Sequence, residues 1–348
     1  MSKRHVLIDA TQYSNWSEKI FHQMNKAGLS AICVTICYHE NFRETVANIT
    51  AWNRRFADFS GVLMLCRSGQ EILQAAKEGR TGIIYALQNC SAIEDDIGLV
   101  EILHQLGVRV MQLTYNNQSL LAAGCYEDSD SGITRFGKQV ISEMNRLGMI
   151  IDMSHSAEKS TLQAMDYSRR PVAITHANPA DWHPSIRGKS HAILRRLKET
   201  KGMLGLSLYP HHLKGGSNCT LQEFCKMVAD VADTVGIDHI GIGSDLCQNQ
   251  PDEVVNWMRN GRWSRNRDFG EGTASNPGFP PQPTWFQNNE DFPRLRDGLT
   301  EIGFSENDTQ RILGENWLRF FSEGFEPEDF PHEIEETSRI SLKRKSGS

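Results

Sequence analysis

The stretch GMIIDMSHSAEKSTLQAMDYSRRPVAITHANP, residues 148–179, places two short apolar runs on either side of a helix-forming segment. The runs are GMIIDMS and PVAIT, and the segment between them, AEKSTLQAMDYS, contains good helix formers with apolar residues at helical spacing. A strand, a helix and a second strand in this order predict a βαβ unit with parallel strands. A histidine follows each strand, His155 after the first and His176 after the second.

The same alternation continues in both directions along the chain. Seven further apolar runs are separated by amphipathic segments: HVLID, SAICVTIC, GVLMLC, GIIYALQ, VRVMQLT, GMLGLSL and HIGIGSD. Nine runs are one more than a (β/α)8 barrel holds, and we place GVLMLC, residues 61–66, outside the barrel. An open doubly wound sheet would want a glycine-rich G-x-G-x-x-G turn, which the sequence does not contain. We therefore predict an α/β protein with a single TIM-type (β/α)8 barrel domain over residues 1–325.

Two segments interrupt this pattern. A long loop is expected at about residues 246–290, and its part RWSRNRDFGEGTASNPGFPPQPTWF, residues 262–286, combines glycine, proline and aromatic residues. Such a length favours a lid or a subunit contact over the barrel mouth, with a mobile surface loop as the alternative. The polar segment 326–348 is expected to be a peripheral or disordered tail.

Composition narrows the class of protein. The chain has 348 residues and a formal net charge of -6, which gives no electrostatic reason to expect nucleic acid or an anionic membrane as a partner. No apolar stretch approaches the ~18 residues of a membrane helix, and the charged start MSKRHVLIDA does not resemble a signal peptide. Eight cysteines without a C-x-x-C pair predict reduced core thiols. We expect a cytoplasmic protein with a small-molecule substrate.

Polar or aromatic residues follow the eight predicted barrel strands: Thr11 and Tyr13, Tyr38, Gln88, Tyr115, His155, His176, Tyr209 and Asp245. Barrel enzymes build their active sites at these carboxyl ends of strands. Two histidines and a carboxylate, His155, His176 and Asp245, are sufficient to bind one zinc-like ion and to leave a position open for water. The structural alternative is that each histidine is simply a hydrogen-bonded residue of the fold.

The sequence also resembles a known family. GITRFGKQVISEMNRLGMIIDMSHSAEKS, PVAITHANP, HPSIRG, GIGSDL and GENWLRFF are similar, in this order, to motifs of the membrane (renal) dipeptidases, zinc peptidases with an amidohydrolase-like barrel. The resemblance runs from about residue 5 to residue 322. It implies a metallo-dependent hydrolase fold and a homodimer, with His155 and His176 as ligands of one zinc. It further implies that Asp245 handles the leaving group or the substrate amine, that Arg187 grips the substrate carboxylate, and that Tyr209 lies close to the substrate.

At three places the sequence departs from the family pattern. The family has D-G-H-x-D on the first strand, an E-G-G-H-type turn on the third and a histidine after L-T on the fourth. Here the matching residues are Thr11 and Tyr13, then Gln88, and then Tyr115. Two dications about 3.5 Å apart repel by roughly 19 kcal/mol at an effective dielectric of 20, so the pair depends on negative ligands that these residues do not supply. We therefore predict one divalent metal per chain at most, zinc or a similar ion, or none.

Three hypotheses for function follow. The first is a dipeptidase-like hydrolase of a small amide or dipeptide with a free carboxylate, in which Gln88 contacts substrate and Tyr115 donates a hydrogen bond to the oxyanion. The second is a barrel that binds a small carboxylate or a betaine-like amine without hydrolysing it. The third is metal-free catalysis by His155, His176, Asp245 and Tyr115. An aromatic cage for a cationic amine would need several of these residues to converge: Tyr13, Trp16, Tyr38, Tyr115, Trp182, Tyr209, Trp263 and Trp285.

Overall fold

The computed structural model describes residues 5–262 and 264–328. Its strands are β1 (Ile8–Gln12), β2 (Ala31–Cys37), β3 (Leu63–Leu65), β4 (Thr81–Leu87), β5 (Val108–Gln112), β6 (Ile150–Asp152), β7 (Ala173–Ile174), β8 (Met203–Leu206) and β9 (Ile240–Ile242). All pairings between these strands are parallel, and β9 returns to pair with β1, so eight of the strands form a closed ring. The predicted TIM-type (β/α)8 barrel is confirmed.

The ninth strand, β3, is the run that the sequence placed outside the barrel. It pairs with Thr81–Ile83, the first half of β4, whereas β5 pairs with the second half of the same strand, Tyr85–Leu87. β2 occupies the other edge of β4 and closes the ring there. GVLMLC therefore extends the sheet without entering the barrel, as predicted.

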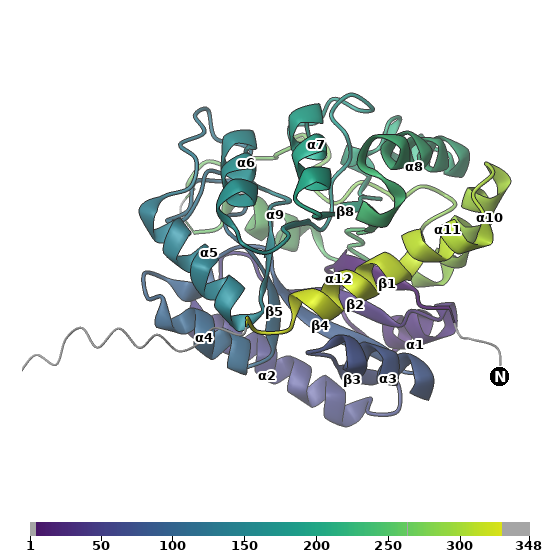
Figure 1. Cartoon of the computed structure of the whole chain (residues 1–348), viewed down its shortest axis with the longest axis horizontal. Coiled ribbons are helices and arrows are strands. Elements are labelled where there is room, and N and C mark those ends of the chain that lie inside the picture. The colour runs from purple at the N-terminus through teal and green to yellow at the C-terminus, as the bar shows by residue number, and fades with distance from the viewer. Residues whose placement is uncertain (1–4, 263, 329–348) are drawn as a thin grey trace, which may run out of the picture.

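Helices surround the ring and follow the strands in chain order (Figure 1). They are α1 (Glu18–Ala27), α2 (Phe42–Asp58), α3 (Gly69–Glu78), α4 (Gly98–Gln105), α5 (Arg135–Leu147), α6 (Glu158–Tyr167), α7 (His191–Glu199), α8 (Leu221–Val235), α9 (Asp252–Asn260), α10 (Pro293–Glu301), α11 (Glu306–Gln310) and α12 (Asn316–Gly324). None of the helices in the described ranges is both long and apolar enough to cross a membrane.

The interior of the barrel is closed at one end by α12. Small and branched apolar residues of the strands, such as Ile8, Ala31 and Ile84, form one buried cluster with Trp317 of this helix. The Trp317 indole donates to the carbonyl of Ile242 at 3.0 Å. The indole of Trp317 can lie this close to β9 only because residue 241 is a glycine, since a Cβ at Gly241 would lie 2.3 Å from Trp317 Nε1. The end of the barrel occupied by α12 is therefore filled by side chains. A functional site is expected at the opposite end, where the strands have their carboxyl ends.

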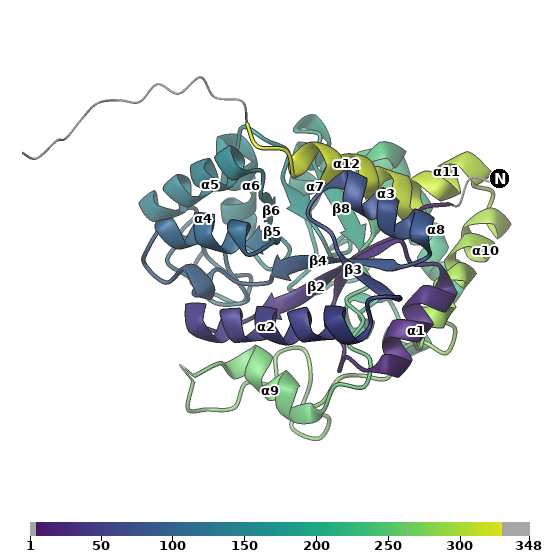
Figure 2. The ribbon, with the colours of Figure 1, turned by 90° about the horizontal axis from the view of Figure 1, so that it is seen from below.

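The opposite end of the barrel is covered by α9 and by the long loop that the sequence predicted. Figure 2 shows α9 and α12 on opposite sides of the barrel. The predicted loop of about 246–290 contains the helix α9, which the sequence analysis did not anticipate. Trp263 and residues 329–348, which make up most of the predicted polar tail, lie outside the described residues. All eight cysteines are unpaired and seven are buried, in agreement with the prediction of core thiols.

Candidate active site

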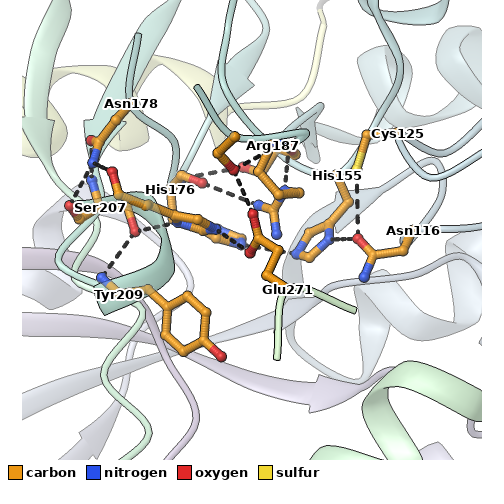
Figure 3. A network of polar contacts seen from close by, with 12 residues as sticks. Asn116, Cys125, His155, His176, Asn178, Arg187, Ser207, Tyr209 and Glu271 are labelled. Carbon is orange, nitrogen blue, oxygen red and sulfur yellow. Dashed lines mark hydrogen bonds and ion pairs between the residues drawn. The ribbon is translucent and has the colours of Figure 1, made fainter. Parts of the chain in front are cut away.

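Two imidazoles meet at the carboxyl ends of β6 and β7 (Figure 3), with 3.1 Å between His155 Nε2 and His176 Nε2. His155 Nδ1 lies 2.6 Å from Asn116 Oδ1, an oxygen that can only accept, so Nδ1 carries the ring proton. His176 Nδ1 lies 2.8 Å from the hydroxyl of Thr175, which already donates its own proton to Asp152 at 2.6 Å. The Nε2 lone pairs of both rings therefore face each other.

Asp152 is the anchor of this arrangement. Its carboxylate accepts four hydrogen bonds, from the backbone and hydroxyl of Ser154 and from the backbone and hydroxyl of Thr175. Complete burial raises the pKa of Asp152, and these bonds act in the opposite direction. Because Ser154 and Thr175 directly precede His155 and His176, one buried carboxylate fixes the backbone that carries both rings.

Burial lowers the pKa of both imidazoles well below the ordinary value, and the nearby Arg187 guanidinium lowers it further. Both rings are therefore neutral around pH 7 and present lone pairs rather than protons to the cavity. Neutral imidazole is the form in which histidine binds metal ions.

Arg187 is a buried cation that forms no ion pair with a carboxylate of the described residues. Its side chain is 5% exposed and donates to two main-chain carbonyls, those of Ser154 at 3.4 Å and His176 at 3.3 Å. Among residues 5–262 and 264–328, no carboxylate oxygen lies within 4.0 Å of it. A buried guanidinium usually has an acidic partner, so this one is prepared to receive an anionic group from a ligand.

Asp245 follows β9 at the same end of the barrel. It has a positive φ of 55°, a conformation in which an aspartate is tolerated, and its N–H donates to the Thr11 carbonyl at 3.0 Å. Burial raises its pKa to about 7, and the Arg187 guanidinium opposes this rise. With this pKa, the protonated and the ionised form of Asp245 are both populated near neutral pH. Asp245 lines the same cavity as Arg187 and His155.

The side chains next to His155 at the ends of β1, β2 and β4 are neutral. Gln88 Oε1 lies 3.0 Å from His155 Nε2, and Gln88 Nε2 donates to Thr35 and to the Tyr38 hydroxyl at 2.8 and 3.2 Å. Tyr13 packs edge-on against Tyr38 with 4.8 Å between ring centroids, and burial raises the pKa of its phenol well above 10. No anionic oxygen replaces the carboxylates that the family pattern has on these strands.

The inner cavity is lined by side chains at the strand ends of the barrel and by side chains of the segments that cover this end, among them α9 and the long loop. The barrel side includes Gln88, Tyr115, His155, Arg187, Tyr209 and Asp245, all of which the sequence predicted as site residues. The cover includes Tyr126, His212, Met258, Arg259, Glu271 and Phe279. His176 reaches the site through its contact with His155, and the predicted long loop contributes Glu271 and Phe279 to the cavity wall. Tyr115 stacks on His155 with 4.0 Å between ring centroids.

Several of these residues were not found from the sequence. Asn116, Tyr126, His212 and Glu271 lie in loops, and loops carry no periodic pattern that would single them out. One signal was present for Glu271, a lone acidic residue between two glycines in the long loop, GEG at 270–272.

The predicted aromatic cage does not form from the residues proposed for it. Of those described, only Tyr115 and Tyr209 line the inner cavity. Trp16 packs against Trp52, and Trp285 is buried with its indole donating to the Cys219 carbonyl. These tryptophans fill the packing around the barrel instead.

The donor set suits one divalent ion better than two. Two converging imidazole lone pairs, with the Gln88 amide oxygen next to them, are suitable ligands for a single zinc-like ion. A second ion lacks anionic ligands, since Thr11, Tyr13 and Gln88 are neutral. Within the described ranges, no three His, Cys, Asp or Glu side chains are grouped so as to hold a metal. The assignment of Asp245 as a third ligand therefore stays a prediction.

A closed (β/α)8 barrel with paired imidazoles and a buried guanidinium at the carboxyl ends of its strands is an amidohydrolase-type barrel. The model of the membrane dipeptidase family, peptidase family M19, matches residues 9–257. This match covers more than half of the chain, which therefore belongs to that family, and the resemblance noted in the sequence is confirmed.

Solved structures agree with this assignment. An amidohydrolase from Pseudomonas aeruginosa is 33% identical, with a TM-score of 0.87 over 92% of this chain and 97% of that one. A metallo peptidase from Rhodobacter sphaeroides, liganded with a phosphinate mimic of the dipeptide L-Ala-D-Ala, has a TM-score of 0.75 over 92% of this chain and 99% of its own. Its identity of 18% shows a common fold alone.

Among curated relatives, dipeptidase tcpJ from Claviceps purpurea (strain 20.1) is 22% identical over 289 residues, which are 82% of this chain and 61% of that protein. Dipeptidase verJ from Clonostachys rogersoniana is 27% identical over 210 residues, 60% of this chain and 54% of that protein. The chain thus spans less than two thirds of the length of either relative.

Proposed function

We propose that the protein is a dipeptidase-like hydrolase of a small amide or dipeptide that carries a free carboxylate. The observation that carries this proposal is the Arg187 guanidinium, which is buried, lines the inner cavity and has no carboxylate partner in the described structure. Arginine binds a carboxylate through two parallel hydrogen bonds, which fixes the orientation of the substrate as well as its charge. The neighbouring imidazoles place the scissile amide next to this clamp.

The residues of the chain have separate roles in this reaction. Tyr115, whose phenol stays protonated because burial raises its pKa, donates a hydrogen bond to the oxygen that gains charge at the attacked carbonyl. The Asp245 carboxylate accepts the proton of the attacking water and returns it to the leaving nitrogen. A divalent ion held by His155 and His176 would supply Lewis acidity at the amide carbonyl.

The test uses Arg187→Met with dipeptides that end in a free carboxylate or in an amide. We expect kcat/KM for the free carboxylate to fall about 10³-fold, because breaking a buried charged pair costs about 3–5 kcal/mol. The amidated substrate should be affected much less, and Arg195→Met on the exposed side of α7 should leave both rates unchanged. A variant that still prefers the free carboxylate would overturn this role of Arg187.

We further propose one divalent ion per chain at most. After loading with zinc and dialysis, metal analysis should find no more than one equivalent, and His155→Ala should lose it. Two equivalents would contradict the argument from the neutral side chains of Thr11, Tyr13 and Gln88. A cytoplasmic location and a homodimeric state stay predictions from the sequence, and light scattering after size exclusion tests the second.

A second candidate function is a barrel that binds a small carboxylate or a betaine-like amine without hydrolysing it. It is favoured by the neutral groups on the side of β1, β2 and β4, where the family pattern has metal ligands. Thermal stabilisation by small carboxylates that depends on Arg187, with no turnover of any dipeptide in the presence of zinc, would support it over the hydrolase.

A further inference from the structure

Glu271 enters the inner cavity from a tightly constrained part of the long loop. It stands between Gly270, whose φ is 53°, and Gly272. The guanidinium of Arg259 passes so close that a Cβ at position 272 would lie 2.9 Å from its Nη1, and the same nitrogen donates to the Pro277 carbonyl at 3.2 Å. The loop is thus folded around the Arg259 side chain, which fixes the backbone that carries Glu271.

Two side chains orient the Glu271 carboxylate. The Ser185 hydroxyl donates to Oε1 at 2.5 Å, and His212 Nε2 lies 3.7 Å from Oε2. His212 Nδ1 is 2.8 Å from the hydroxyl of Ser207, which accepts from the N–H of Tyr209. The Ser207 hydroxyl keeps a proton that it can donate to His212 Nδ1, and in this tautomer the ring proton of His212 is on Nε2. His212 Nε2 is buried, has no hydrogen-bond partner among the described residues and lies 3.7 Å from Glu271 Oε2.

The Glu271 carboxylate has no cation in direct contact with it in the described part of the chain, and the Arg187 guanidinium in the same cavity interacts with it only over a longer distance. Burial lowers the pKa of His212 well below its ordinary value, so this ring is neutral. Within residues 5–262 and 264–328, no lysine or arginine nitrogen lies within 4.0 Å of the Glu271 carboxylate. The Arg187 guanidinium in the same cavity likewise lacks a carboxylate partner. Two unpaired charges of opposite sign, which do not contact each other, complement a ligand that carries both a carboxylate and a cation.

The surroundings of Glu271 also suit a cation. Glu271 borders both the inner cavity and an outer groove formed by Tyr126, His183, Ser185, Ile186, His211 and Asp268. The groove and the cavity share Tyr126 and Glu271, so the Glu271 carboxylate lies where the two spaces adjoin. Tyr126, Tyr209 and Phe279 place aromatic rings in the cavity wall, and the faces of such rings attract cations.

We propose that Glu271 selects substrates with an ammonium group, which it binds while Arg187 holds the substrate carboxylate. The inference rests on the proposed function for the position of that carboxylate. A neutral or acidic group in place of the ammonium group is disfavoured, because the Glu271 carboxylate would then lose water without gaining a partner. Ser185 and His212 are positioning residues for Glu271 in this scheme.

The test measures binding without turnover. The probe is the ketomethylene isostere of Ala-Ala, which has no amide bond to hydrolyse, either with its free amine or with an acetylated amine. By calorimetry at pH 7, we expect the wild-type protein to bind the free-amine isostere at least about tenfold more tightly, in the range of a charge-assisted hydrogen bond. Glu271→Gln keeps the size and the Ser185 contact and should abolish most of this ratio. The exposed Glu253→Gln on α9 makes the same charge change outside the cavity and should preserve it.

Two results would overturn the inference. In the first, Glu271→Gln keeps the preference for the free amine, so that Asp245 alone accounts for it. In the second, the wild-type protein binds both isosteres equally or binds neither. Equal weakening of both isosteres by Glu271→Gln, with a lowered melting temperature, would assign the residue a structural role instead. Hydrolysis of Ala-Ala is measured separately, so a protein that binds selectively but does not hydrolyse refutes the proposed function and leaves this inference standing.

Discussion

The ends of β6 and β7 carry imidazoles whose Nε2 atoms face each other, whereas the ends of β1, β2 and β4 carry hydroxyl, phenol and amide groups. The supporting residues differ in the same way. The imidazole side is held by charged groups, the Asp152 carboxylate and the Lys189 ammonium, which donates to the carbonyls of Met153 and Ser156 at 3.1 and 3.2 Å.

On the other side, the buried carboxyl of Asp9 accepts hydrogen bonds from Ser244 and Gln12, and a chain of side-chain amides continues from Gln12. Gln12 donates to Asn289, Asn289 donates to Gln248, and Gln248 donates to Gln23, all within a buried chain of side-chain amides. Asp9 is enclosed by these donors and does not line the inner cavity, whereas Gln88, which lines it on this side, is neutral. The Arg187 guanidinium, near the imidazoles, presents a charge to the cavity that a ligand can complement. The barrel is the same on both sides, so the difference in chemistry comes from a few side chains at strand ends.

The largest expected effect is on the pH dependence of the unfolding free energy, which Lys189 on the imidazole side should change and Gln248 on the other side should not. Burial lowers the pKa of Lys189 to about 8, below the ordinary value near 10.4 that it has in the unfolded chain. Between these two values the unfolded state binds more protons, so the stability of the wild-type protein rises with pH relative to a variant without the amine. From pH 7 to pH 10.5, the unfolding free energy of wild type relative to Lys189→Met should rise by up to about 3 kcal/mol.

Gln248→Leu is the matched control on the neutral side, because it removes an amide hydrogen bond and no titrating group. Its difference from wild type in denaturant unfolding should be the same at both pH values. The buried cysteines and tyrosines titrate in all three proteins, and their contribution cancels in each difference. A difference for Lys189→Met that does not change with pH would show that the pKa of Lys189 is the same in the native and the unfolded state, which would contradict the lowering of this pKa by burial.

A smaller effect is expected from Tyr115→Phe at the boundary between the two sides. The phenyl ring keeps the stacking on His155 but loses the hydroxyl that we assign to the oxyanion. If the hydrolase is correct, kcat should fall about 10²-fold with little change in KM, as for the loss of one oxyanion donor. Steady-state kinetics with a dipeptide measures the split. An equal rise in KM without loss of kcat would instead place the hydroxyl in ground-state binding.

The sequence predicted the barrel because a buried parallel strand has a local signature, a short apolar run bounded by helical segments. It also identified the run at 61–66 as the strand outside the ring, which the pairing of β3 with β4 confirms. His155, His176, Arg187 and Asp245 were identified because each follows a strand or belongs to a family motif.

The cover of the cavity could not be predicted in the same way. The position of Glu271 depends on a loop folded around Arg259, and the orientation of His212 depends on a local contact with Ser207. Both lie in segments without periodicity. The aromatic cage, which the sequence left open, does not form from those residues for a related reason, since an aromatic residue near a strand end, such as Trp16, can pack outward as well as inward.

The smallest expected effect is on zinc affinity, and it comes from a substitution that gives the side of β4 a charged group. Gln88→Glu places an anionic oxygen where an amide oxygen now lies 3.0 Å from His155 Nε2. Attraction between a carboxylate and a divalent ion exceeds the cost of burying the carboxylate only when the ion is bound, so zinc affinity should rise about tenfold. The dissociation constant is measured by competition with a chelator, and Gln105→Glu, on the exposed face of α4, supplies the same charge far from the cavity. Unchanged affinity in Gln88→Glu would mean that the imidazole nitrogens do not hold the ion next to this side chain, and that the contrast between the two sides does not govern metal binding.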